Sequence, residues 1–127
     1  MVTATTSVIH AGQGRDLVHG NAGEDFVSGG KGKDTLLGNS GDDDLRGNEG
    51  TDLLDCGAGN DLLRGGQKAD SISGGAGADL LVGGTRPDVL DGGPDLDEYS
   101  GGGGHDTCVV DPANRAELSL SCEAKVG

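Results

Sequence analysis

The stretch Gly74-Gly75-Ala76-Gly77-Ala78-Asp79-Leu80-Leu81-Val82 holds the complete form of a nine-residue pattern that decides the fold of this chain. Glycine stands at places one, two and four of the unit, aspartate at place six and a large aliphatic residue at place eight. The pattern returns every nine residues without a phase slip from Ala11 to Val109, in eleven consecutive copies. An unbroken period this short predicts a solenoid, in which each repeat packs on its neighbours.

Aspartate occupies place six in every copy. Because all eleven acids recur at the same position of the unit, we interpret them as part of the repeat and not as acids scattered over a solvated surface. They are the candidate site residues of the chain. They are Asp16, Asp25, Asp34, Asp43, Asp52, Asp61, Asp70, Asp79, Asp88, Asp97 and Asp106.

The unit divides into a six-residue turn and a short strand around place eight. Place two is glycine in eight copies and asparagine in three, the two residue types that best tolerate positive φ, so we expect a left-handed turn there. In a strand the side chains alternate between faces, so place eight points inward and places seven and nine point outward. The inward residues are Val18, Val27, Leu36, Leu45, Leu54, Leu63, Ile72, Leu81, Leu90, Tyr99 and Cys108.

Nine residues are too few to close a coil, so two units are needed for each one. We therefore predict an all-β solenoid of about five and a half 18-residue coils, a flattened tube of two parallel sheets with an aliphatic ladder inside. Residues 11–109 would form the repeats, residues 1–10 an N-terminal lead-in strand and residues 110–127 a C-terminal cap. Caps are expected because the open ends of a solenoid expose apolar side chains and strand edges. In the cap, residues 111–114 read as a turn and residues 118–120 as a short strand.

The composition agrees with a repeat and excludes several classes of protein. The 127 residues include 27 glycines, one Phe, one Tyr and no Trp, too little apolar area for an ordinary globular core. With 22 acidic and nine basic residues the formal net charge is −13, so we expect a cation to complete the fold and no nucleic acid to bind. No segment resembles a membrane span or a signal peptide, and we interpret the chain as a module of a longer protein.

The repeats resemble the RTX (hemolysin-type) calcium-binding nonapeptide, and this resemblance covers residues 11–109. It implies a right-handed parallel β-roll that binds Ca²⁺ between successive turns on the same edge. It also implies that the place-six carboxylates and the carbonyls around places one to four are the ligands. Under this implication Asp16 shares an ion with the turn that ends at Asp34, and Asp25 with the turn that ends at Asp43.

Elementary coordination chemistry also favours calcium. Ca²⁺ takes six to eight oxygen ligands, and glycine turns present carbonyls without an obstructing Cβ. The repeat offers no soft or imidazole ligands for a transition metal, and Mg²⁺ prefers smaller shells that retain water. Pairing copies two apart gives at most nine interior sites. We expect the site between the turns that end at Asp70 and Asp88 to be the weakest or to be remodelled, because Lys68 and Arg86 replace glycine at place four.

Two further features carry separate expectations. Phe26, Leu62, Leu80 and Val82 point outward on one sheet and could contact a flanking domain or a second copy of the chain. Cys108 and Cys122 either form a disulfide that holds the cap or remain two buried thiols. Cys56 replaces a place-one glycine and is expected to be a free thiol.

These observations lead to one preferred function and one alternative. The preferred hypothesis is a calcium-binding module of a secreted, extracellular protein that folds when several Ca²⁺ ions bind. The alternative is a structural or adhesive solenoid whose outer face binds a partner, with calcium as scaffold only. An enzymatic role is not expected, because the chain has no zinc-protease motif and no nucleophile elbow.

Overall fold

The computed structural model describes residues 5–111, 118–120 and 122–126, and these residues form strands and turns without any helix. None of them can therefore form a helix that crosses a membrane. The strands are β1 (Val8–Gln13), β2 (Leu17–Ala22), β3 (Phe26–Lys31), β4 (Thr35–Ser40), β5 (Asp44–Glu49), β6 (Leu53–Ala58), β7 (Leu62–Gln67), β8 (Ser71–Ala76), β9 (Leu80–Thr85), β10 (Val89–Asp91), β11 (Glu98–Gly103), β12 (Asp106–Val110), β13 (Leu118–Leu120) and β14 (Cys122–Val126).

The strands stack into two parallel seven-stranded sheets. One sheet holds the odd-numbered strands in the order β1-β3-β5-β7-β9-β11-β13, and the other holds the even-numbered strands from β2 to β14. Within the repeats each residue pairs with the residue one coil further on, as Val27 does with Leu45 and Leu36 with Leu54. The result is a β-solenoid of about 6 turns of about 18 residues. The prediction of an all-β parallel solenoid with two units in each coil is confirmed.

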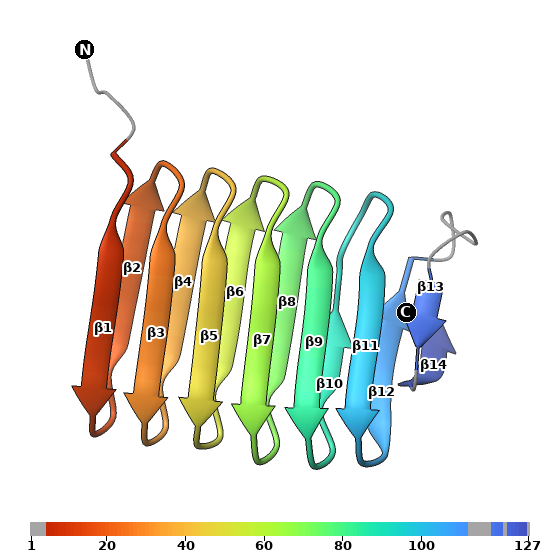
Figure 1. Ribbon diagram of the computed structural model, residues 1–127. Helices are drawn as coiled ribbons and strands as arrows, with labels where there is room; N and C mark the ends of the chain where they lie inside the picture. The colour runs from red at the N-terminus through yellow and green to blue at the C-terminus, as the bar shows by residue number, and fades with distance from the viewer. Residues whose placement is uncertain (1–4, 112–117, 121, 127) are drawn as a thin grey trace.

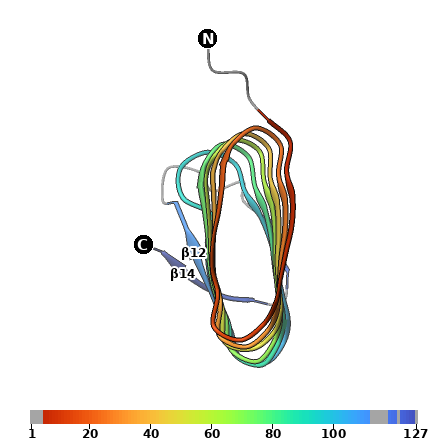
Figure 2. The same cartoon turned by 90° about the vertical axis from the view of Figure 1, so that its left-hand side faces the viewer.

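The coil is right-handed and flattened. In Figure 1 the odd-numbered strands run downward in front, the even-numbered strands run upward behind, and the chain advances from left to right. Figure 2 looks along the axis and shows the coils superposed as one narrow loop with two long sides. The turns that follow odd-numbered strands therefore lie on one edge of the tube, and those that follow even-numbered strands lie on the other.

The interior is a ladder of the place-eight side chains from both sheets. Strand burial alternates along the chain, as in β2 and β6, where exposed residues flank buried ones. From Val27 to Leu90 the place-eight residues are between 0 and 1% exposed. One layer of place-eight side chains from each sheet thus fills the tube, and these layers, together with Cys56 at place one, form the buried hydrophobic core of the repeats.

Places two and four both adopt positive φ throughout the repeats. At place two the asparagines Asn21, Asn39 and Asn48 have φ of 81°, 79° and 78°, which confirms the left-handed turn predicted there. At place four φ is 116° to 144° at Gly41 and Gly50, but 73° at Lys68 and 81° at Arg86. A side chain at place four therefore draws the backbone toward the left-handed helical region, which a non-glycine residue can occupy at a cost.

The N-terminal lead-in continues the repeat backwards. β1 begins at Val8, pairs with β3 through Val8 and Phe26, and runs on into the first copy. Ser7 takes the position of the place-six aspartate, and its backbone N–H donates to Asp25 Oδ1 over 2.7 Å. The lead-in strand is thus a degenerate extra copy of the unit, which could be found by counting nine residues back from Asp16. Residues 2–4 of the expected lead-in lie outside the described residues.

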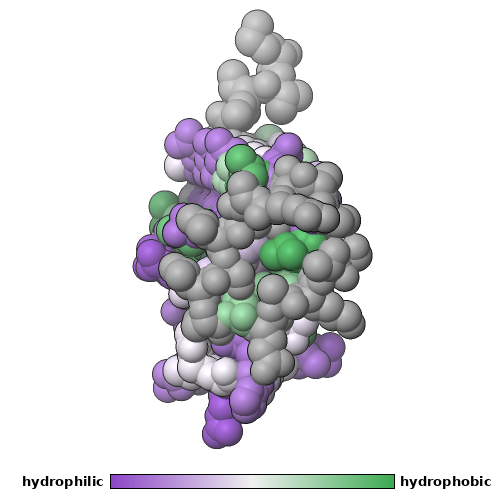
Figure 3. All heavy atoms as spheres, turned by 90° about the vertical axis from the view of Figure 1, so that its right-hand side faces the viewer, coloured by the Kyte–Doolittle hydropathy of each residue, from purple (hydrophilic) through white to green (hydrophobic). Residues whose placement is uncertain are grey.

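The C-terminal segment adds a final irregular coil. β13 pairs with β11 and β14 pairs with β12, so the short strand predicted at residues 118–120 is confirmed. The turn predicted at residues 111–114 falls mostly outside the described residues. Figure 3 views this end, where a few apolar side chains lie exposed among polar ones.

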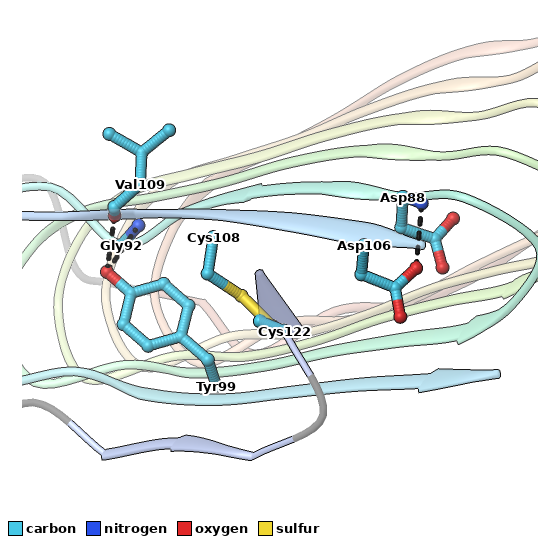
Figure 4. The surroundings of a disulfide bond; sticks show 7 residues. All are labelled: Asp88, Gly92, Tyr99, Asp106, Cys108, Val109 and Cys122. Carbon is cyan, nitrogen blue, oxygen red and sulfur yellow. Dashed lines mark hydrogen bonds between the residues drawn. A yellow bond between two sulfur atoms is a disulfide. The ribbon is translucent and has the colours of Figure 1, made fainter. Parts of the chain in front are cut away.

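A disulfide and a buried tyrosine hold the C-terminal coils together (Figure 4). Cys108 in β12 and Cys122 in β14 are joined, with 5.7 Å between their Cα atoms, so the disulfide expectation is confirmed. Tyr99 lies inside the tube, where its hydroxyl donates to the Val109 carbonyl over 2.8 Å and accepts from the Gly92 N–H over 3.1 Å. These contacts close the ladder at the point where the repeat ends.

Phe26, Leu62, Leu80 and Val82 lie on the outer side of one sheet, as expected, and each is partly exposed. Phe26 is half-buried against its neighbours, because its ring lies edge-on to His10 at 5.7 Å and the Arg46 guanidinium lies 4.8 Å from its centroid. Leu62, Leu80 and Val82 are also only partly exposed. The exposed large apolar side chains are Val8, Leu17, Leu53, Val89 and Leu96. A partner on the Phe26 face stays a prediction.

The two neighbouring leucines Leu53 and Leu54 should contribute differently to the free energy of unfolding, because only Leu54 belongs to the inward ladder. We predict that Leu54→Ala lowers the free energy of unfolding by about 2–5 kcal/mol, because it leaves a cavity in a fully buried layer. The matched control Leu53→Ala removes an exposed side chain from the same strand and should change it by less than about 0.5 kcal/mol. Urea unfolding in one fixed buffer measures both, and equal losses would contradict the inward and outward assignment.

Candidate metal sites in the turns

The structure brings the predicted aspartates together in two stacks, one on each edge of the tube. Turns after odd-numbered strands end at Asp16, Asp34, Asp52, Asp70, Asp88 and Asp106. Turns after even-numbered strands end at Asp25, Asp43, Asp61, Asp79 and Asp97. From Asp25 onward each of these residues is between 1 and 4% exposed. The pairing of turns two copies apart is the pairing expected from the sequence.

One oxygen of each carboxylate links successive turns. The backbone N–H of Asp34 donates to Asp52 Oδ1 over 2.8 Å, and Asp52 in turn donates to Asp70 Oδ1 over 2.8 Å. The same bond joins Asp88 to Asp106 over 2.9 Å in Figure 4. It recurs along both edges at 2.7–2.9 Å. Each aspartate therefore fixes the turn one coil before its own.

The second oxygen is buried with no hydrogen bond among the described residues. Burying such an oxygen costs about 1–3 kcal/mol for a neutral group and more for a charged one. Repeated along both edges, this cost requires a compensating positive charge or a proton. The oxygens concerned are Oδ2 of Asp16, Asp25, Asp34, Asp43, Asp52, Asp61, Asp70, Asp79, Asp88 and Asp106.

Glycine at place one leaves an oxygen-lined space in front of this second oxygen. A Cβ on Gly29 would lie 2.6 Å from Asp34 Oδ2 and 3.1 Å from the carbonyl oxygen of Gly47 in the next coil. A Cβ on Gly20 would lie 2.7 Å from Asp25 Oδ2 and 2.9 Å from the carbonyl oxygen of Gly38. We call this space, between the place-one glycine, the place-six Oδ2 and the next place-one carbonyl, the cradle of a turn. Two oxygen acceptors thus border the space at each of these turns, which suits a hard cation.

Burial controls the protonation of these carboxylates when no cation is bound. It raises the pKa of Asp61 and of Asp70 to about 7, and that of Asp88 to about 6. The N–H bond from the previous turn lowers each pKa, and the neighbouring carboxylates of the same stack raise it again. The fold thus penalises the charged form of aspartates that are otherwise ionised at neutral pH.

The ligand set is limited to oxygen. In the part of the chain that the structure describes, no three His, Cys, Asp or Glu side chains gather into a metal-binding group. An ion in a turn must therefore take part of its ligands from backbone carbonyls such as those lining the cradles. Carboxylate and carbonyl oxygens are typical ligands of calcium and poor ones for soft metals.

The turn expected to be weakest shows a local opening. The pairing of β7 with β9 ends at Gly66 and Gly84, whereas β5 and β7 also pair Glu49 with Gln67. In the preceding interval, between the turns that end at Asp52 and Asp70, the bond from the Gly50 N–H to the Gln67 carbonyl is 3.4 Å long, against 2.8–3.0 Å in the turns before it. The Asp70 N–H still donates to Asp88 Oδ1, so the aspartate stack itself is kept. Weaker binding at this site stays a prediction.

The tenth turn departs further from the repeat than the sequence suggested. β10 ends at Asp91, and a Cβ on Gly92 would lie 2.5 Å from the Tyr99 hydroxyl, so this hydroxyl borders the cradle of that turn. Asp95 at place four reaches back, and its Oδ2 accepts from the Gly77 N–H over 3.0 Å. The large inward side chain of Tyr99 was visible in the sequence, but the direction of its hydroxyl was not.

A second polar stack was not predicted. At place five, Asp42 Oδ1 accepts from the Asn60 N–H over 2.8 Å, and Asn60 Oδ1 accepts from the Ala78 N–H over 2.9 Å. These exposed side chains tie together turns that the even-edge aspartates already join. Asp or Asn at the same place in two copies eighteen residues apart was the available signal.

The fold and the turns define a class of protein, the parallel β-solenoid with acidic, carbonyl-lined turns suited to hard cations. The family described as RTX calcium-binding nonapeptide repeat (4 copies) matches residues 3–36, 19–54, 28–63, 57–85 and 73–108. These matches span most of the chain, and it belongs to this calcium-binding repeat family. No curated protein sequence matches the chain.

The raised carboxylate pKa values give the cation-free chain a distinctive pH dependence. A group whose pKa is higher in the folded state stabilises the fold below its unfolded pKa, and this stabilisation is lost as the pH rises through the folded pKa. For Asp61, Asp70 and Asp88 the loss extends up to about pH 6–7. We predict that, after removal of divalent cations, the far-UV circular dichroism signal of strands is larger at about pH 4.5 than at about pH 8. The first pH lies below the raised pKa values of these aspartates and the second lies above them. A strand signal that grows with pH in the absence of metal would contradict the assignment.

Proposed function

We propose that this chain is a calcium-dependent folding module of a secreted protein, with Ca²⁺ bound between successive turns on both edges of the solenoid. The observation that carries the proposal is the repeated buried Oδ2 without a hydrogen bond, facing a second acceptor across a cradle that glycine leaves open. Bound Ca²⁺ would supply positive charge and accept six to eight oxygen ligands. The place-six aspartates would hold it, together with turn carbonyls, in up to nine interior sites.

The residues of each turn have distinct roles in this proposal. The place-six Oδ1 keeps two turns in register through the N–H bond, while Oδ2 is left to meet the ion. Glycine at place one keeps the cradle empty, and positive φ at places two and four folds the turn tightly around it. All these parts lie between two coils, so a complete site does not exist in the unfolded chain.

Coupling of binding to folding follows from this geometry. A ligand that binds only the folded form stabilises it by about 2.7 kcal/mol at a concentration 100 times its dissociation constant, and several sites act together. Two features make the folded state unstable without calcium. The net charge is −13, and the hydrophobic core has only one layer of aliphatic side chains from each sheet. We infer that the chain is unfolded at neutral pH without calcium and folds when the stacked carboxylates are neutralised.

The same coupling supports a location outside the cell. RTX repeat proteins are typically secreted. Extracellular calcium modules bind with dissociation constants of about 10⁻⁴ to 10⁻³ M, so a chain of this kind would stay unfolded at cytosolic calcium concentrations and fold after export. The disulfide between Cys108 and Cys122 is also typical of an oxidising compartment. No catalytic role is proposed for these residues.

The proposal is tested by titrating the chelator-treated chain with Ca²⁺, and separately with Mg²⁺, at pH 7.5 while following far-UV circular dichroism. We expect strand signal to appear cooperatively with Ca²⁺ only, because Mg²⁺ prefers an octahedral shell that retains several waters. A full strand signal in chelator that Ca²⁺ leaves unchanged would refute the proposal.

A matched pair of variants separates the proposed ligands from surface charge. Asp52→Asn should raise the calcium concentration at the midpoint several-fold, because Asp52 is a buried turn residue whose Oδ2 has no hydrogen bond. Asp55→Asn removes an equal charge from an exposed position in the next strand and should leave the midpoint nearly unchanged. Equal shifts would mean that general charge, and not the turn site, controls folding.

A further inference from the structure

Cys56 breaks the glycine rule of place one in the middle of a stack. Place one is glycine in nine of the eleven copies, and the other exception is Ala11 in the first copy. Cys56 begins the turn that ends at Asp61, the central turn of the five on its edge. It is fully buried, so its side chain lies inside the tube where other copies have none.

The neighbouring turns of the same edge show what a side chain at this position meets. A Cβ on Gly38 would contact Asp43 Oδ2 and lie 2.9 Å from the carbonyl oxygen of Cys56. A Cβ on Gly74 would contact Asp79 Oδ2 and lie 2.9 Å from the carbonyl oxygen of Gly92. In both turns the cradle is open only because glycine has no Cβ.

At the turn that ends at Asp61, the Cβ and thiol of Cys56 belong in that same space. Asp61 is 4% exposed, and its Oδ2 is buried with no hydrogen bond among the described residues. The sulfur of Cys56 is a soft donor and a poor ligand for a hard cation, so it does not replace an oxygen ligand there.

We propose that Cys56 closes the cradle between the turns that end at Asp61 and Asp79, so that no Ca²⁺ binds there and the ladder of this edge is divided at its centre. This inference rests on the proposed calcium binding and specifies which of the interior sites is missing. The carbonyl of Cys56 still lines the cradle of the preceding turn, so that site is kept. On the other edge Ala11 carries a Cβ at the first, terminal turn, and from Gly29 onward place one is glycine in every copy, so no Cβ interrupts the ladder between its later turns.

The consequence is a functional difference between two edges that otherwise look alike. On the Cys56 edge two neighbouring sites remain before the closed one, between the turns that end at Asp25, Asp43 and Asp61, and a single site remains after it, between the turns that end at Asp79 and Asp97. On the other edge each site after the first coil has neighbours that share its aspartates. Removal of Cβ at one position should therefore create a site, whereas most substitutions in a binding repeat destroy one.

The experiment compares Cys56→Gly, Cys56→Ala and the unaltered chain, with bound Ca²⁺ counted by equilibrium dialysis against saturating radiolabelled Ca²⁺. Cys56→Gly restores the residue of the complete repeat and should bind one more ion per chain. Cys56→Ala keeps the Cβ, removes only the sulfur and should leave the count unchanged. Gly38→Ala places a Cβ in the neighbouring cradle and should remove one ion, and the chain already accommodates alanine at this place in Ala11.

Three results would overturn the inference in distinguishable ways. If Cys56→Gly and the unaltered chain bind the same number of ions, Cys56 does not close the site. If Cys56→Ala also gains an ion, the sulfur and not the Cβ is responsible, and the steric account is wrong. If the unaltered chain binds no Ca²⁺ at all, the proposed function fails and this inference fails with it. Circular dichroism in Ca²⁺ shows that each variant counted is folded.

Discussion

The rest of this structure depends on one constraint, namely that the two oxygens of each place-six carboxylate have different surroundings. One oxygen accepts an N–H from the previous coil and sets the register between turns, and the other is left buried beside a carbonyl. A stack of such groups repels itself unless positive charge or protons are supplied. The thin aliphatic ladder of the core could not offset that repulsion alone, because each coil contributes only two large inward side chains. Stability is therefore tied to the turns more than to the core.

Much of this arrangement could be predicted because a strict period leaves few alternatives. The fixed positions of Asp and of the place-eight residues in the unit predicted where the strands lie, which side chains point inward and that copies two apart pair with each other. Asn at place two indicated positive φ at that position. The single outward Phe26 illustrates the limit of such reasoning. Its exposure depends on how His10 and Arg46 fold over it, which a face assignment alone does not contain.

The features that were not predicted lie where the period is locally broken. Ser7 stands nine residues before Asp16, and its backbone N–H continues the row of donors to the aspartate stack, although its side chain does not match the residue of the repeat. The tenth turn is reshaped by the hydroxyl of Tyr99, whose two hydrogen bonds reach Gly92, which follows β10, and Val109 in β12. Lys68 and Arg86 were expected to disturb their turns, and the opening beside Gln67 is small because both residues adopt positive φ. Such adjustments depend on contacts between coils and not on any one repeat.

Amide hydrogen exchange tests the central claim most directly, because the N–H of each place-six aspartate is the donor that joins two turns. With saturating Ca²⁺ at pH 7.5, we expect the amides of Asp34, Asp52 and Asp70 to be strongly protected together. In chelator at the same pH, their protection should be lost, and so should that of the amides of Asp25, Asp43 and Asp61 on the other edge. Protection of these amides that is equally strong in chelator would show that the stacked turns hold without a cation and would contradict the account.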